Sequence, residues 1–243
     1  GGAVSPLNLT STAGSITINA DLQSSSGNAF TLDAASNITT QFIKSGGSPV
    51  AFLSNLTAGN LLTINNFNAT EGSLTAISGG LTTVNGSFIT NGGDVNITSN
   101  GGVLITTNMD TAAGDISITN STVGLINFNP GFSTTSGNVT LTNNANVAAG
   151  VQSGFIDFGS DITTDSGNVT IQALGDGNVF IPTFVTNTGD FAISATSGSI
   201  LFDGQGSGTN LSGSGNFSAS TVSGDITFTA PITAVSGSSL SIN

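Results

Sequence analysis

The chain has no His, Cys, Trp or Tyr, and Lys44 is its only basic residue. Without His or Cys there is no imidazole to activate a nucleophile and no ligand set for zinc. A single Lys provides no basic cluster that would stabilise an oxyanion or a sugar acid. We therefore expect no enzymatic activity. Two-carboxylate glycoside hydrolysis is the alternative left open, because Asp157, Asp161 and Asp165 lie close together in the sequence.

Positive charge is equally scarce. One Lys stands against 13 acidic residues, which gives a formal net charge of −12. Such a chain has nothing with which to neutralise phosphates or an anionic bilayer, so we expect no nucleic-acid partner and no membrane-surface binding. No apolar run approaches the roughly 20 residues of a spanning helix, so the chain is not expected to be membrane-embedded. The lack of Cys means that no disulfide holds the fold.

What the sequence does contain is a repeated motif. An apolar residue is followed by two or three Thr, Ser or Asn, then Gly, then Asp, Asn or Ser, and then an apolar-polar-apolar alternation. That alternation has the period of a half-buried β-strand. The clearest copies occupy residues 88–97, 109–118, 132–141, 162–171 and 184–193. Recurrence at this spacing indicates a repeat protein.

The spacing of the copies sets the length of the repeating unit. The steps from Phe88 to Met109, from Met109 to Phe132 and from Ile162 to Phe184 are 21, 23 and 22 residues. We expect a further strand between copies, at 102–105, 125–128, 155–158, 179–181 and 200–202. A unit of this size cannot bury an apolar face alone but can do so when it is stacked on copies of itself.

The sequence therefore predicts an all-β fold, a parallel β-solenoid with coils of about 20–23 residues. We expect a right-handed β-helix, because crossovers between parallel strands are overwhelmingly of that hand. Residues 1–243 form one array, with irregular excursions near 34–53 and 203–215. The first of these segments is either an excursion or a coil with an extended loop. The longer step from Phe132 to Ile162 is expected to be a loop that bulges from a corner.

Two columns of residues emerge when the copies are aligned. The first is glycine, for which we expect a corner that requires positive φ. Its members include Gly14, Gly27, Gly93, Gly114, Gly137, Gly167, Gly189 and Gly224. The second column follows the glycine and holds short polar side chains that bond to the backbone at turns and form ladders between coils. Its members include Asp94, Asp115, Asn138, Asn168, Asp190 and Asp225.

No cofactor is expected, with weak Ca²⁺ binding as the alternative. Asp94 and Asp115 would lie one coil apart, and two stacked carboxylates repel unless a cation lies between them. The GGxGxDxUx nonapeptide of calcium-loaded β-rolls is absent from the sequence.

A file of outward-facing Thr suggests an ice-binding face as a weaker alternative function. Thr is also the ordinary uncharged strand former that faces water, which is the simpler explanation. The file consists of Thr17, Thr31, Thr63, Thr75, Thr140, Thr170 and Thr227, with a partial second file at Thr98, Thr119, Thr142 and Thr229.

Segments such as SGNVTL, AGDISI, TGDFAI and SGSILF, joined by Ser/Thr/Asn-rich corners, resemble the β-helical shafts of filamentous-haemagglutinin-like exoproteins and giant bacterial surface adhesins. The resemblance covers nearly the whole chain. It implies an exported, extracellular polypeptide at the cell surface, whose shaft supports attachment, aggregation or matrix building. It carries no functional residue over to this sequence.

We therefore expect a stiff structural shaft or filament. Neither end shows a polar cap, so further coils of the same polypeptide or other copies in head-to-tail contact are the expected partners. The alternative is an adhesive module that binds host or matrix glycans or proteins through the loops near 34–53 or 203–215.

Overall fold

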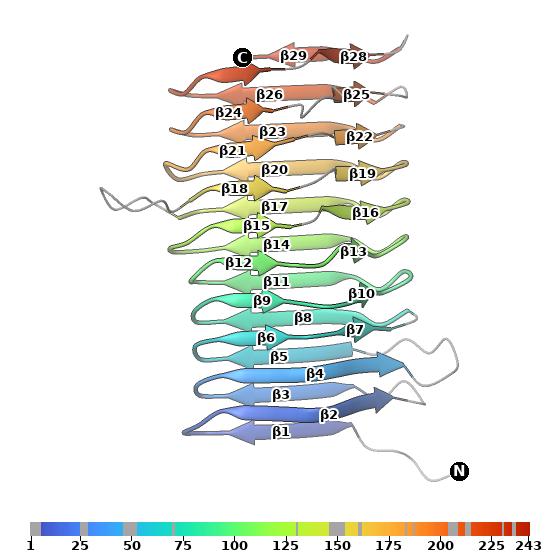
Figure 1. The fold of residues 1–243 in the computed structure, drawn as a ribbon, viewed down its shortest axis with the longest axis vertical. Helices are drawn as coiled ribbons and strands as arrows, with labels where there is room; N and C mark the ends of the chain where they lie inside the picture. The colour runs from blue at the N-terminus through green and yellow to red at the C-terminus, as the bar shows by residue number, and fades with distance from the viewer. Residues whose placement is uncertain are drawn as a thin grey trace.

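The computed structural model describes residues 6–24, 29–45, 53–69, 71–129, 131–145, 154–159, 162–182, 184–186, 188–203, 209–211, 215–229, 231–234 and 237–243. Within these ranges the chain forms 29 β-strands, stacked along one axis from the N-terminus to the C-terminus (Figure 1). Every strand pairing in the described part of the chain is parallel and joins strands of successive coils. The predicted all-β parallel β-solenoid is confirmed.

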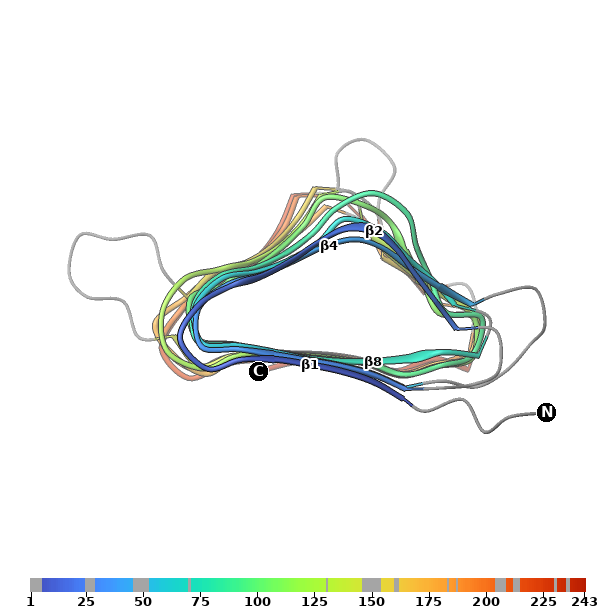
Figure 2. The same ribbon diagram turned by 90° about the horizontal axis from the view of Figure 1, so that it is seen from below.

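One wall of the solenoid is an eleven-stranded sheet, called here the wide sheet. Figure 2 looks along the stack and shows this sheet as the straight lower side of a roughly triangular outline. Its strands are β1 (Leu7–Ser11), β3 (Phe30–Ala34), β5 (Leu53–Ala58), β8 (Ser73–Ser78), β11 (Val95–Ser99), β14 (Ile116–Asn120), β17 (Val139–Asn143), β20 (Val169–Ala173), β23 (Phe191–Ala195), β26 (Phe217–Thr221) and β29 (Leu240–Ile242).

The other two sides of the outline belong to an 18-stranded sheet. The long strands β2 (Ile16–Ser24) and β4 (Ile38–Ser45) begin it. Each later coil contributes two short strands instead. The first track holds β6 (Leu62–Ile64), β9 (Thr82–Val84), β12 (Val103–Ile105), β15 (Ile126–Phe128), β18 (Ile156–Phe158), β21 (Val179–Ile181), β24 (Ile200–Phe202) and β27 (Ile226–Phe228). The second track holds β7 (Phe67–Asn68), β10 (Phe88–Ile89), β13 (Met109–Asp110), β16 (Phe132–Thr134), β19 (Ile162–Thr164), β22 (Phe184–Thr186), β25 (Thr209–Leu211) and β28 (Ile232–Ala234).

The register confirms the alignment of the five clearest copies. Phe88 pairs with Met109, Met109 with Phe132, Phe132 with Ile162, and Ile162 with Phe184. The strands expected between copies are present as β12, β15, β18, β21 and β24. The coils are about 23 residues long. The hand of the winding stays a prediction from the crossover rule.

The expected irregular segments are only partly within the described residues. Strand β4 (Ile38–Ser45) lies inside the segment 34–53 and pairs with β2, β6 and β7, so this part of the segment belongs to the coils. Residues 46–52 lie outside the described ranges. Strand β25 (Thr209–Leu211) lies inside the segment 203–215, while 204–208 and 212–214 lie outside them. The loop expected between Phe132 and Ile162 falls on residues 146–153, which also lie outside.

The core is a set of apolar ladders along the axis. Inward side chains alternate with outward ones on each strand, and the inward positions are almost completely buried, as in β11 and β14. Aromatic rings stack from coil to coil. The ring centroids of Phe67 and Phe88 are 5.1 Å apart, and those of Phe202 and Phe228 are 4.5 Å apart. Burial of these stacks supplies the main stabilising free energy, because no coil has an apolar core of its own.

A buried polar ladder runs beside the apolar ones. Ser78, Ser99, Asn120 and Asn143 are paired in register at the end of the wide-sheet strands and are at most 1% exposed. The Asn120 side chain donates to Asn143 Oδ1 (3.0 Å) and accepts from the Gly102 amide (3.0 Å). These side chains satisfy backbone groups where the chain turns out of the sheet, which is why polar residues are tolerated there.

The glycines are required for a different reason from the one expected. No glycine of the predicted column among Gly93, Gly114, Gly137, Gly167 and Gly189 has positive φ. Positive φ is instead found one or two residues earlier at this corner, at Glu71, Asn91, Gly92 and Ala112. The constraint on the glycines is the distance between coils. A Cβ on Gly93 would lie 2.0 Å from the carbonyl oxygen of Gly72 in the coil before it.

The same carbonyl contact recurs at two corners. At the entry corner, where the chain enters the wide sheet, the stacked glycines are Gly72, Gly93, Gly114, Gly137, Gly167, Gly189 and Gly215. At the exit corner, where the chain leaves the wide sheet, Gly154, Gly177, Gly198 and Gly224 stack in the same way. The assignment of Gly14 and Gly224 to one column with the others is therefore wrong, because both lie at the exit corner. Gly27 lies outside the described residues.

Replacement of an interior entry-corner glycine should separate the coils. In Gly167→Ala the new Cβ would lie 1.9 Å from the Gly137 carbonyl oxygen, and backbone cannot move aside as a flexible side chain can. We expect a loss of about 3 kcal/mol in the free energy of unfolding, measured by urea denaturation. Gly14→Ala is the matched control, because the nearest atom to its Cβ is Ser11 Oγ at 3.4 Å. Equal stability of the two variants would contradict the carbonyl contact.

Candidate functional site

The Asp/Asn column is a hydrogen-bonded ladder at the entry corner. Each side-chain oxygen accepts the backbone N–H of its counterpart one coil further on. Asp94 Oδ1 accepts from the Asp115 amide (3.0 Å), and Asp115 Oδ1 accepts from the Asn138 amide (2.7 Å). The ladder continues from Asn138 to Asn168, Asp190 and Asn216, with distances of 3.1, 2.9 and 2.8 Å. The predicted ladder between coils is thus present for five of its six predicted members.

The sixth predicted member, Asp225, belongs to the exit corner. Its amide donates to Ser199 Oγ (3.1 Å), and the Ser199 amide donates to Asn178 Oδ1 (2.7 Å). The two corners use the same short polar side chains in the same way. The sequence motif of Gly, a short polar residue and a strand therefore occurs at both corners. The spacing of its copies in the sequence did not distinguish one corner from the other.

The Ca²⁺ alternative depended on carboxylates that face one another without a partner. In the structure Asp94 and Asp115 each accept an amide N–H of the following coil, which stabilises each carboxylate through a charge-assisted hydrogen bond. Among the described residues there is no group of three or more His, Cys, Asp or Glu side chains arranged to hold a metal ion. The column is better explained as a structural ladder.

The ladder predicts unequal effects of two substitutions at one position. Asp115→Ala removes the acceptor of both the backbone and the side-chain N–H of Asn138, so we expect a loss of about 1 kcal/mol in the free energy of unfolding. Asp115→Asn keeps an acceptor oxygen, as Asn138 and Asn168 do in the next coils, and is expected to be close to wild type. Chemical denaturation measures both. A loss in Asp115→Asn as large as that in Asp115→Ala would contradict the ladder.

The predicted Thr file is divided between two walls. Thr31, Thr75, Thr140 and Thr170 face outward on the wide sheet, where Asn55, Asn96, Ser117 and Ala192 interrupt them. Thr17, Thr63 and Thr227 lie on the other sheet. The single file proposed for ice binding is therefore wrong. In the partial second file, Thr98, Thr119 and Thr142 are aligned on the wide sheet, and Thr229 follows β27 elsewhere.

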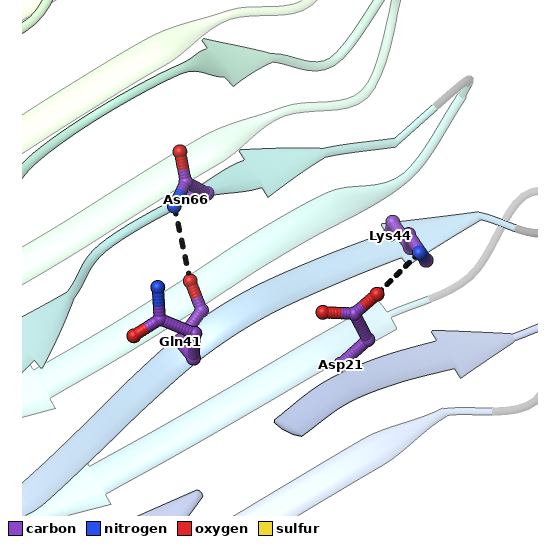
Figure 3. A network of polar contacts seen from close by, with 4 residues as sticks. All are labelled: Asp21, Gln41, Lys44 and Asn66. Atoms are coloured by element: carbon purple, nitrogen blue, oxygen red, sulfur yellow. Dashed lines mark hydrogen bonds and ion pairs between the residues drawn. The ribbon is translucent and has the colours of Figure 1, made fainter. Parts of the chain in front are cut away.

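The only basic side chain of the chain is already paired. Lys44 on β4 forms an ion pair with Asp21 on β2 (Figure 3). The Lys44 Nζ also lies 5.3 Å from the centre of the Phe42 ring. Beside it, the Asn66 side chain donates to the Gln41 carbonyl oxygen (3.1 Å). These contacts connect successive coils on the outer face of the 18-stranded sheet. Lys44 thus has a structural partner at the start of the array.

A pocket opens on the outer side of the first track. It has a volume of about 320 Å³ and is lined by Leu125, Phe155, Asp157 and Phe180. Asp157 lies at the centre of β18, between Asn127 on β15 and Phe180 on β21. The Phe155 and Phe180 rings lie with centroids 5.7 Å apart and planes inclined by 51°. We call this site the wall pocket.

Asp157 is half-buried in these apolar surroundings. Desolvation raises the pKa of its carboxyl above the ordinary value, and a hydrogen bond from the Phe158 backbone lowers it in part. The Asn127 side-chain N–H donates to Asp157 Oδ2 (3.1 Å). Of the other two carboxylates in the hydrolysis alternative, Asp165 follows β19 and Asp161 lies outside the described residues.

The raised pKa of Asp157 predicts a stability effect with a defined sign. When the folded-state pKa is the higher one, the ionised carboxylate penalises the folded state above both pKa values and not below them. Asp157→Asn should therefore raise the Tm at pH 7. The two proteins should converge below about pH 3.9, where unfolded Asp is protonated. Thermal unfolding across this pH range measures the difference, and a lower Tm for the variant at pH 7 would contradict the desolvation of Asp157.

The aromatic lining of the wall pocket was missed in the sequence. Most of the Phe side chains that the structure describes on the first track, such as Phe128, Phe158 and Phe202, are buried in the interior ladders. Phe180 is different, because it stands between the buried Val179 and Ile181 and so has the outward phase of its strand. Val179, Phe180 and Ile181 are all apolar, so no apolar-polar alternation in the sequence marks Phe180 as outward. The pairing of Phe180 with Asp157 could not be predicted either, because it depends on the register between coils.

Comparisons of the chain with protein-family models, curated proteins and solved structures gave no match. In the part of the chain that the structure describes, no helix is long and apolar enough to cross a membrane. The fold therefore defines the class of protein as a parallel β-solenoid, with no family established.

Proposed function

We propose that the chain is an extracellular structural module, a stiff shaft or filament segment at a cell surface that supports adhesion, aggregation or matrix building. The observation that carries the proposal is the uninterrupted pairing from β1 to β29 along the wide sheet. Hydrogen bonds and apolar stacks follow one axis through all the coils. A force along that axis is shared by every coil, which is the mechanical property of a spacer.

The outer surface supports the same proposal. The described outward positions of the wide sheet are mostly uncharged Thr, Ser and Asn, and the chain as a whole has only 6% charged residues. A wall of this kind is hydrated without forming a patterned electrostatic surface. The fold is also held without any disulfide, since the chain contains no Cys. The resemblance in repeat style to adhesin shafts gives the expected location, outside the cell.

The ends of the described array offer surfaces for further stacking. Strands β1 and β29 are the two edges of the wide sheet. On β29, Leu240 and Ile242 are 50% and 47% exposed, whereas the apolar residues at their register positions in earlier coils are buried. Leu7 and Leu9 on β1 are only partly buried. Exposed strand edges with apolar faces template more strands, which supports association of the array with a second copy.

End-to-end association is the test of this proposal. We expect rods longer than one chain to appear with rising concentration in analytical ultracentrifugation and in negative-stain electron microscopy, because association buries the apolar faces at the two ends. Leu240→Lys should abolish them by placing a charge in the joint. Val123→Lys is the control, since Val123 is 52% exposed at the exit corner between β14 and β15, several coils away from β29. A monomer at all concentrations would contradict association through the ends.

A further inference from the structure

We propose that the wall pocket binds an organic cation, with an alkylammonium group held against the Phe155 and Phe180 rings and with the Asp157 carboxylate as its counter-charge. The inference goes beyond the shaft function, since a shaft needs no ligand. The pocket is formed by outward side chains of three successive coils, and the residues that line it are not part of the repeated sequence motif. Leu125 and Phe155 precede β15 and β18, while Phe180 lies on β21.

The aromatic geometry favours a cation. The two rings are inclined by 51° with centroids 5.7 Å apart, so they form two walls of a pocket and leave room beside them. A cation within about 6 Å of a ring face is attracted by the negative charge density of that face. The volume of about 320 Å³ is roughly ten times the ~30 Å³ share of one water, so a trimethylammonium or butylammonium group fits within it.

The polar group in the pocket favours the same ligand. Asp157 is half-buried and receives hydrogen bonds from Asn127 and from the Phe158 backbone, but it has no basic side chain beside it in the described part of the chain. The one Lys of the protein is paired with Asp21 on β2. A partly desolvated carboxylate gains most from an opposite charge. A purely apolar ligand would desolvate Asp157 further and leave it uncompensated.

The charge of the whole molecule excludes the opposite ligand class. With 13 acidic residues against one basic residue, the protein repels anions such as phosphate, sulfate or uronate groups and attracts cations. An alkylammonium group occurs in two sources with the same chemistry, the quaternary ammonium of a choline headgroup and the primary ammonium of a Lys side chain. Both present a positive charge on an apolar body, which is what two Phe rings and one carboxylate recognise.

The test is a titration of the whole chain with small probes, followed by NMR through the amide and methyl signals of Leu125 and its neighbours. Choline and butylammonium represent the two sources. The uncharged isostere of choline, 3,3-dimethylbutan-1-ol, has the same shape without the charge. We expect at least one cation to bind with shifts centred on Leu125, Phe155 and Phe180, and the isostere to bind roughly 10-fold more weakly or not at all. The better of the two cations identifies the source.

Variants locate the site and separate its loss from misfolding. Asp157→Asn and Phe180→Thr should each weaken binding roughly 10-fold, because they remove the counter-charge and one ring. Thr already occupies the equivalent outward position in β9 and β27, two other strands of the first track, so the replacement suits the fold. Asp110→Asn removes the same charge from an exposed position on β13 and should bind as the wild type does. Equal binding of choline and its isostere, or no binding by either cation, would overturn the proposal.

Discussion

Parallel pairing between each strand and the strand one coil away is the interaction on which the whole structure depends. A coil of about 23 residues encloses too little apolar surface to be stable alone, and its backbone amides and carbonyls have few partners within the coil. The strands of the neighbouring coils supply both the missing apolar contacts and the missing backbone hydrogen-bond partners. Ladders such as Val139 against Val169 and Leu141 against Ile171 satisfy the backbone and close the apolar core in a single step.

That pairing also explains the residues at the corners. Stacked coils bring the corner backbones so close that only glycine fits, since a Cβ at Gly114 would lie 2.1 Å from the Gly93 carbonyl oxygen. The residue that follows the glycine then bonds to the amide of the next coil, as Asp94 does to Asp115. Inside the wall, Asn120 and Asn143 satisfy the backbone at the exit corner. Each of these positions is constrained by the coil before or after it in the stack.

The strands and their phase could be predicted from the sequence, because alternation in segments such as VTLT and FAIS is a local property. Alignment of the five clear copies also predicted their register, which Phe88, Met109 and Phe132 confirm. Features that depend on how the coils stack on one another were not predicted. Gly224 and Asp225 belong to the same local sequence motif as Gly189 and Asp190, but they lie at the exit corner and not at the entry corner. The wall pocket was missed because it combines residues from three coils, of which only Asp157 had been singled out.

The account is tested most directly by contacts between methyl groups along one interior ladder. In the structure Ile118, Leu141, Ile171 and Ile193 are register partners in series, although 22 to 30 residues separate successive members. Nuclear Overhauser effects in a methyl-labelled sample should therefore connect each of these residues to the next one in the series. Strong effects between strands adjacent in the sequence, in place of this series, would contradict the parallel stacking of coils.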